Sequence, residues 1–418
     1  MTEPAQHTEE PFETKNAQST GRSAPGVFAT ESFDFQLMRW LSQTTYSGAE
    51  IGECFSTAHL IEDGNTESWL QEWSTTAHRV EGMARDCLDR GHRVSAREAF
   101  LRATTYYEAA FFYAAGSDPR KRELYLKHRQ CFREAGALFD TPFEAVAIPY
   151  EGRTLPGYFM APDDSGTPRK TVMIITGGDG TAERLYFSGG GAAAVRRGYN
   201  ALCFEGPGQS GAFMLDPSLT YRYDWEVPTS AAVDYLVSRP EVDVDRIGYI
   251  GYSWGGYFVP RAAAFEKRIS ACVANCLLPD VYTPVVQTME VDTLLAAGAQ
   301  VTDDQLTTKQ RYSIEEGLPR FGFLPRADNL GAWGVMMKKM TLWGLEDKIT
   351  IPLLNMSATG EGKAMHDNAK LFYDKLTNPR NRFVLTDEDH GAELHTQRGN
   401  SSLLHQIQFD WLDEIFAI

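Results

Sequence analysis

The spacing of apolar residues divides the chain into two regions. Between residues 31 and 141, apolar side chains recur every three or four positions, which is the period of a helix with one buried face. From residue 142 onward, short apolar runs alternate with helical stretches. The pattern therefore predicts an N-terminal helical domain, residues 31–141, followed by an α/β domain, residues 142–418.

Local signals place three helices within the first region. Residues 67–91 carry one mostly apolar face. Ser95 and Glu98 are spaced as a capping box, which predicts that the next helix begins at residue 95. Asp118–Pro119 joins a capping side chain to a proline suited to a first turn, which predicts a third helix. The predicted apolar face of the first helix consists of Trp69, Trp73, Thr76, Val80, Met83 and Cys87.

The second region predicts a mostly parallel, doubly wound sheet. Its first segment, "FEAVAIPYEGRTLPGYFMAP", has short apolar stretches around a glycine and predicts a β-hairpin. Residues of about 281–345 are rich in aromatic residues and methionine and lack a strand pattern, so we expect a helical cap insertion over the C-terminal edge of the sheet. Short apolar strands separated by helices are typical of α/β folds. The six further strand candidates are 171–176, 199–204, 246–252, 269–275, 352–357 and 382–386.

Charge and composition narrow the possible partners and the expected location. The chain has 418 residues, a net charge of −16 and no cluster of lysine or arginine, which argues against nucleic acid and anionic membranes as partners. No apolar run approaches the roughly 18–20 residues of a membrane span, and residues 1–30 read as a disordered tail without a secretory signal. The six scattered cysteines suggest free thiols rather than a metal site. We therefore expect a cytoplasmic protein.

One glycine-rich segment matches the motif of a dinucleotide-binding site. Residues 206–211, "GPGQSG", match G-x-G-x-x-G after a predicted strand, but the following residues do not predict the helix that a dinucleotide site requires. An acidic residue about 20 positions later, at the end of a second strand, is also missing. The sequence predicts no cofactor, and a glycine-lined turn at the edge of a cleft is the favoured interpretation.

The strongest chemical signal is a serine set between glycines. Gly251, Ser253 and Gly255 form G-x-S-x-G between an apolar strand and a stretch that can form a helix. This strand, turn and helix context is typical of an elbow that exposes a nucleophilic hydroxyl. The alternative is a structural serine in a tight turn, and the context favours the nucleophile.

A serine nucleophile needs a histidine base and a carboxylate that orients it. Glu361 lies just beyond the penultimate predicted strand and is preferred to Asp347 and Asp367 as the acid. His390 and His395 both lie in the loop after the last strand, where the base is expected, and spacing alone does not separate them. His366 and His405, the other histidines after the serine, fall in predicted helices.

The tetrahedral intermediate of such a reaction needs two backbone N–H donors. Trp254, the residue after the serine, supplies the first. The loop "TGGDG", residues 176–180, follows the first central strand and supplies the second through Gly178 or Asp179.

The chain resembles α/β-hydrolases that carry an N-terminal helical domain before the catalytic domain. The matching segments include "GGDGTAERLYF", "FEGPGQSG", "GYIGYSWGGYFVPRAAA" and "GAELHTQRGNSSLLHQ". The resembled group includes 2,6-dihydroxypseudooxynicotine hydrolase and fungal secondary-metabolite hydrolases of the fusarin and cytochalasan type. The resemblance implies the α/β-hydrolase fold, Ser253 as nucleophile, Glu361 as acid and His395, within "HTQ", as base. The segment "DEDHGAEL" is longer than in the group, so His390 stays an alternative.

The resemblance also implies a substrate class. Members of this group hydrolyse a C–C or ester bond beside a carbonyl in medium-sized, polyketide-derived or aromatic substrates. Two alternatives stay open: a cyclase or lyase acting without net hydrolysis, and a non-catalytic binding protein, which the complete triad disfavours. A homodimer through the helical domain is also open.

Three further residues are candidates for substrate contact. Tyr107 and Phe111 belong to an aromatic helical segment and line a pocket only if they are not core residues. Asp280 follows a predicted strand and either contacts substrate or caps a turn.

Overall fold

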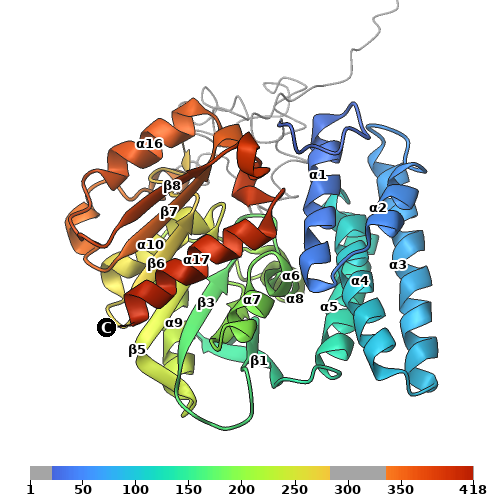
Figure 1. Ribbon diagram of the computed structural model, residues 1–418, viewed down its shortest axis with the longest axis horizontal. Coiled ribbons are helices and arrows are strands. Elements are labelled where there is room, and N and C mark those ends of the chain that lie inside the picture. The colour runs from blue at the N-terminus through green and yellow to red at the C-terminus, as the bar shows by residue number, and fades with distance from the viewer. Residues whose placement is uncertain (1–20, 283–335, 418) are drawn as a thin grey trace, which may run out of the picture.

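A computed structural model describes residues 21–282 and 336–417, and the account that follows is confined to them. The N-terminal helices form an upright layer beside an α/β unit built on one sheet (Figure 1). Among the described helices, none is long and apolar enough to cross a membrane. The helices of the N-terminal layer are α1 (Glu31–Leu41), α2 (Ile51–Ala58), α3 (Thr66–Asp89), α4 (Arg93–Phe112) and α5 (Pro119–Gly136).

All three helices predicted in this region are present, but one of them begins at a different residue from the predicted one. Helix α5 begins at Pro119, and the Asp118 carboxylate accepts the Arg120 N–H as predicted. The predicted capping box is wrong, because α4 begins at Arg93 and its interior contains Ser95. Gly91, with φ of +77°, ends α3 in a left-handed turn that lets α4 begin almost at once.

The buried face of α3 differs in part from its prediction. Trp69, Trp73, Thr76 and Val80 are buried, whereas Met83 is 45% exposed. Cys87 is only half-buried. Alanines at 77 and 84 are buried instead, where α4 packs against α3. Small side chains allow this close approach, so the apolar face contains alanines that a search for large residues passes over.

The α/β unit contains an eight-stranded sheet in the order β1-β2-β4-β3-β5-β6-β7-β8. The hairpin of β1 and β2 is antiparallel, as is the pairing of β2 with β4. All other neighbours are parallel, which confirms the predicted hairpin and mostly parallel sheet. The strands are β1 (Phe143–Tyr150), β2 (Arg153–Met160), β3 (Arg169–Ile175), β4 (Asn200–Phe204), β5 (Val242–Tyr252), β6 (Ala271–Asn275), β7 (Leu353–Ala358) and β8 (Arg382–Thr386).

Helices cover both faces of the sheet, and each face has its own apolar core. Along β3, Val172 and Ile174 join the core shared with α17 (Ser401–Phe416), whereas Met173 and Ile175 join the core shared with α10 (Gly255–Phe265). This alternation follows from the two-residue period of a strand buried on both faces. The helices of the unit are α6 (Ala182–Phe187), α7 (Gly191–Arg196), α8 (Ser210–Leu215), α9 (Glu226–Val237), α10 (Gly255–Phe265), α16 (Lys363–Tyr373) and α17 (Ser401–Phe416).

The predicted tail extends too far along the chain. The carboxylate of Glu393 accepts bonds from both the N–H and the hydroxyl of Ser23, at 2.7 and 2.8 Å. The N–H groups of Gly26 and Val27 both donate to Asp34 at 2.8 Å. Residues 21–30 are therefore held by polar contacts, which composition alone does not reveal. Most of the predicted insertion, residues 283–335, lies outside the described residues.

His405 in α17 predicts a pH dependence of stability. Burial lowers the pKa of its imidazole to about 3, below the ordinary value near 6.5. The neutral ring fits its partners, because Nδ1 accepts from the Tyr46 hydroxyl at 2.9 Å and Nε2 donates to the Ser188 carbonyl at 3.1 Å. The unfolded chain binds a proton here below about pH 6.5 and the folded chain does not, so stability falls as the pH falls from 6.5 toward 3.

The expected size of this dependence is about 1.4 kcal/mol per pH unit. Urea unfolding of the wild type between pH 6.5 and 5 measures it, and His405→Gln supplies the comparison. The variant is expected to lose less stability over this range. Equal slopes for the two proteins would mean that His405 does not account for the effect.

Candidate active site

Ser253 occupies a strained turn between β5 and α10. Its φ is +58°, a left-handed value that a non-glycine residue seldom adopts. The Ser253 N–H donates to the Asn275 carbonyl at 2.5 Å, which fixes the turn to the end of β6. A side chain on Gly251 would place its Cβ 2.4 Å from the Gly255 carbonyl oxygen. The glycine at position 251 is thus required by this close approach, whereas a Cβ on Gly255 would come no nearer than 3.4 Å to its neighbours.

His395 and Glu361 meet at the end of the sheet where β7 and β8 finish. Nδ1 of His395 lies 2.7 Å from Oε1 of Glu361, and the Glu361 side chain is fully buried. Oε2 of Glu361 accepts the Ala358 N–H at 3.1 Å. Both carboxylate oxygens are therefore engaged. With a proton on Nδ1, Nε2 of His395 is the acceptor available to a hydroxyl.

Asn275 ties the serine turn to the histidine loop. Its carbonyl accepts from Ser253, while its Nδ2 donates to Oε1 of Gln397 at 2.6 Å. Gln397 in turn donates to the Thr386 hydroxyl at 3.2 Å. Thr396 and Gln397 both have positive φ, so the chain after His395 turns sharply. These bonds bring together segments that are more than 100 residues apart in sequence.

His390 has different surroundings. It lies in the short helix η6 (Glu388–His390), and its side chain is 59% exposed. Its Nδ1 lies 2.6 Å from Oδ1 of Asp387. The two histidines that spacing left open are therefore distinguished by their partners, since only His395 is bonded to Glu361.

The loop after β3 reaches the serine through Gly177. A Cβ on Gly177 would lie 2.6 Å from Cβ of Ser253 and 3.0 Å from the backbone nitrogen of Trp254. The peptide unit joining Gly177 to Gly178 is thus beside the serine, and it carries the Gly178 N–H. Asp179 is the other residue predicted to donate a backbone N–H here. Its side-chain carboxylate is bonded to the Arg39 guanidinium at 2.7 Å, a bond that does not involve that N–H.

Gln209 is a residue that sequence reasoning missed. Its Nε2 donates to the carbonyl oxygens of Thr176 and Gly177, at 2.7 and 2.9 Å, and its Oε1 accepts the Gly206 N–H. The side chain is fully buried. Gln209 therefore orients the loop that faces Ser253. The only signal in the sequence was its place in "GPGQSG", a turn expected at the edge of the cleft.

A short helix does follow that turn, contrary to the prediction. Helix α8 begins at Ser210, and its six residues are too few to show a period in the sequence. The Glu205 carboxylate accepts the N–H groups of Gly211 and Ala212, and also that of Ala182. Burial, followed by the charge of Glu183, raises the pKa of Glu205 to about 7. A protein carboxylate thus occupies the helix start that a nucleotide phosphate would need.

A substitution at Gly177 tests whether the loop after β3 contributes to catalysis at Ser253. We expect Gly177→Ala to lower kcat/KM by about 100-fold or more, because the added methyl group displaces the loop from Ser253 and from the Trp254 N–H. Steady-state kinetics measure the change. Gly82→Ala is the control, since a Cβ there meets nothing within 4 Å. Normal activity in Gly177→Ala would contradict this assignment of the loop.

The three candidate substrate contacts, Tyr107, Phe111 and Asp280, each have partners within the protein. Tyr107 is fully buried and its hydroxyl donates to Glu81 at 2.5 Å, while Phe111 packs edge-on against the rings of Tyr125 and His128. These contacts favour the core alternative for both residues. Asp280 accepts the Tyr282 N–H at 3.0 Å, which favours its capping alternative.

Cys276 lies against the acid. Its thiol, a nitrogen of His395 and a carboxylate oxygen of Glu361 lie within 4.8 Å of one another. Burial, and then Glu361 itself, raise the pKa of Cys276 well above its usual value.

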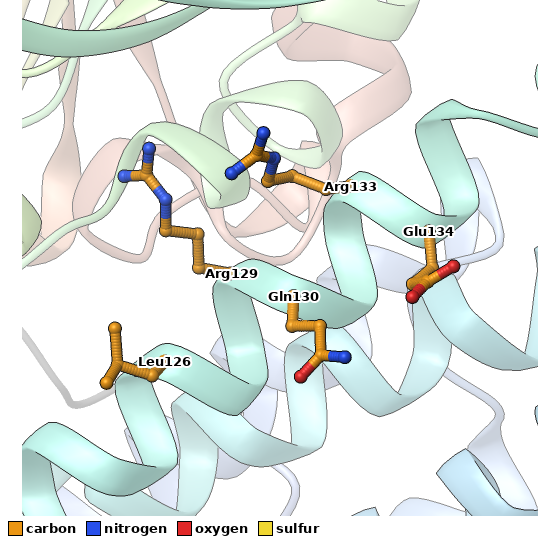
Figure 2. A pocket seen from close by; sticks show the side chains of 5 residues that line it. All are labelled: Leu126, Arg129, Gln130, Arg133 and Glu134. Atoms are coloured by element: carbon orange, nitrogen blue, oxygen red, sulfur yellow. The ribbon is translucent and has the colours of Figure 1, made fainter.

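A surface hollow on α5 is separate from these residues. It is lined by side chains of that one helix, which Figure 2 shows along successive turns. None of the predicted catalytic residues lines it. Its lining residues are Leu126, Arg129, Gln130, Arg133 and Glu134.

Comparisons with known proteins show which proteins the chain is similar to. No family model matches the chain. Hydrolase LUC6 from a Fusarium species is 31% identical over 94% of this chain and 98% of its own length. The 20-hydroxy-prefusarin hydrolase FUS2 of Gibberella moniliformis is also 31% identical, over the same shares. The α/β hydrolase xenA of Xenoacremonium sinensis is 39% identical over 58% of this chain and 59% of its own length.

A solved structure shows the same fold. The 2,6-dihydroxy-pseudo-oxynicotine hydrolase superposes with a TM-score of 0.65 at 19% identity, covering 90% of this chain and 96% of that one. This match includes the N-terminal helices as well as the sheet, because it extends over nearly the whole chain. Three observations support the assignment of a family. They are the sheet order, the strained serine turn, and the two relatives that match this chain over most of their length. The chain belongs to the α/β-hydrolase family and is an enzyme.

Proposed function

We propose that this enzyme is a serine hydrolase that cleaves a C–C or ester bond beside a carbonyl group. Ser253 is the nucleophile, His395 the general base and Glu361 the group that orients it. The observation that carries this proposal is the 2.7 Å bond between His395 and the buried Glu361, on a loop tethered through Asn275 to the strained Ser253 turn.

The first half of the reaction forms an acyl-enzyme. Nε2 of His395 takes the proton of the Ser253 hydroxyl as Oγ attacks the carbonyl carbon, and Glu361 stabilises the imidazolium that results. The N–H groups of Trp254 and Gly178 stabilise the negative charge on the carbonyl oxygen. The bond beside the carbonyl then breaks, and His395 returns the proton to the leaving carbon or oxygen.

The second half releases the acid. A water molecule gives its proton to His395 and attacks the acyl carbon, and collapse of the second intermediate restores the Ser253 hydroxyl. The balance is one water consumed for each bond cleaved. Net uptake of one water separates this reaction from cyclisation, which yields an isomer or loses water.

We infer that the substrate is a medium-sized carbonyl compound of secondary metabolism. The support is the relative from Gibberella moniliformis, a 20-hydroxy-prefusarin hydrolase. That relative covers 94% of this chain, so the match includes parts of both the helical domain and the α/β domain.

A burst experiment tests the proposal without knowledge of the natural substrate. Mixing the enzyme with p-nitrophenyl butyrate is expected to release nitrophenol in a burst of one equivalent per enzyme, followed by slower turnover as the acyl-enzyme is hydrolysed. Absence of ester cleavage above the rate of Ser253→Ala would count against a serine hydrolase.

A further inference from the structure

Three buried arginines converge on the loop that faces Ser253. Arg39 comes from α1 of the helical domain, Arg184 from α6, and Arg398 from the segment directly after η7 (His395–Gln397). Their exposed fractions are 6%, 3% and 9%. Arginine is rarely buried to this extent unless its charge is balanced by partners.

The carboxylates around the three arginines do not balance their charge. Asp179 bonds to Nη1 of Arg39 at 2.7 Å and to Nη2 of Arg184 at 3.2 Å. Glu108 lies 3.5 Å from Nε of Arg184. No ion pair joins Arg398 to a carboxylate in the described part of the chain. Two carboxylates therefore face three guanidinium groups, which leaves one positive charge in excess.

Several N–H donors of this cluster point at no acceptor. Nε of Arg39, Nη1 of Arg184, and both Nε and Nη1 of Arg398 are buried and lack a hydrogen-bond partner within residues 21–282 and 336–417. Leaving such donors unpaired is costly, and each one calls for an explanation. Burial, followed by the charges of Arg39 and Arg184, lowers the pKa of Arg398 to about 9, as expected for a cation without a counter-ion.

The cluster lies next to the proposed reaction centre. Asp179, which bridges two of the arginines, is two residues from Gly177, the glycine that abuts Ser253. Arg398 is three residues from His395 and acts electrostatically on Tyr252, the residue before the serine. A group bound by the free donors would therefore be held close to Ser253.

We propose that Arg39, Arg184 and Arg398 bind a planar anion with two oxygen atoms, a carboxylate or the enolate of a β-dicarbonyl, that forms part of the substrate. The guanidinium fork matches such an anion in shape and charge, and one more negative charge neutralises the cluster. Arg39 makes the helical domain part of the substrate site. This inference rests on the proposed function, because it places the anion beside a nucleophilic Ser253.

Protection of Ser253 from a fluorophosphonate probe tests the subsite. Benzoate supplies a carboxylate, the cyclic β-diketone dimedone supplies an enolate, and benzamide is the neutral match of benzoate. We expect benzoate or dimedone to slow labelling of wild-type Ser253 at concentrations where benzamide does not. Protection by benzoate alone identifies the carboxylate, and protection by dimedone alone identifies the enolate.

Arg398→Met is the matched variant. Each protein is compared with its own uncompeted labelling rate, and the anion concentration for half-protection is expected to rise at least about tenfold in Arg398→Met. Arg382→Met, which removes an exposed arginine paired with Glu414, is the control and is expected to keep wild-type protection.

The outcomes separate this inference from the proposed function. Normal Ser253 labelling that neither anion slows more than benzamide overturns the subsite and leaves the hydrolase proposal intact. Failure to label Ser253 at all counts against the nucleophile instead. If Arg398→Met does not fold, the comparison of the two anions with benzamide in the wild type still shows whether an anion binds near Ser253.

Discussion

Replacing Ser253 by alanine is expected to lower kcat/KM by about 10⁴-fold or more, with the fold unchanged. The substitution removes the Oγ that forms the acyl-enzyme and leaves any residual rate to the backbone donors alone. Alanine and serine face the same strain at a φ of +58°, so the turn itself is not altered. Initial rates with p-nitrophenyl butyrate measure the effect.

A second serine provides the control. Ser238 is exposed, and its hydroxyl donates to the Tyr235 carbonyl at the end of α9, so Ser238→Ala is expected to keep wild-type activity. The melting temperature of both variants checks that each is folded. If Ser253→Ala keeps more than about a tenth of the wild-type kcat/KM, chemistry at another group carries the reaction.

Replacing His395 by alanine is expected to cost a similar factor, about 10⁴-fold in kcat/KM. Without the imidazole, the proton of the serine hydroxyl has no acceptor held in place by Glu361. The same ester assay measures the loss. Losses at Ser253 and His395 are expected to be far from additive, because the two side chains act in one step.

His390→Ala is the matched control for this prediction. Both histidines lie in the same loop, but His390 is bonded to Asp387 and is largely exposed. We expect His390→Ala to keep activity within about twofold of the wild type, as is usual for exposed positions away from the site. A large loss in His390→Ala with little loss in His395→Ala would reverse the roles of the two residues.

The fold could be predicted because its signals are local. Short apolar runs marked the strands, and the turn at Gly152 between two such runs marked the hairpin. Elements with weak local signals were missed or displaced. Helix α8 has only six residues, and α4 begins two residues before Ser95 because Gly91 reverses the chain there. The Glu205 carboxylate accepts N–H groups at the start of α8, whereas the left-handed turn at Gly91 precedes the start of α4.

Only those residues of the site that lie in recognisable sequence motifs could be predicted. The elbow around Ser253 depends on neighbouring glycines, and Glu361 follows a recognisable strand, so both were proposed from sequence. Spacing could not separate His390 from His395, since the difference lies in which carboxylate each one meets. That difference appears only when β7 and β8 are placed side by side.

The long-range polar contacts left no trace in the sequence pattern. Gln209 bonds to the loop at Thr176, and Arg39 bonds to Asp179 across 140 positions. Nothing in the local spacing of an arginine on an amphipathic helix marks it as buried. The convergence of three arginines on one loop is therefore a property of the folded chain.

Peptide mapping after reaction with a fluorophosphonate tests the central claim most directly. The phosphonyl group is expected on Ser253 in the wild type and in His390→Ala, on no residue in Ser253→Ala, and at a rate lower by orders of magnitude in His395→Ala. Labelling of another residue in the wild type, or undiminished labelling of Ser253→Ala, would contradict the assignment of Ser253 as the nucleophile.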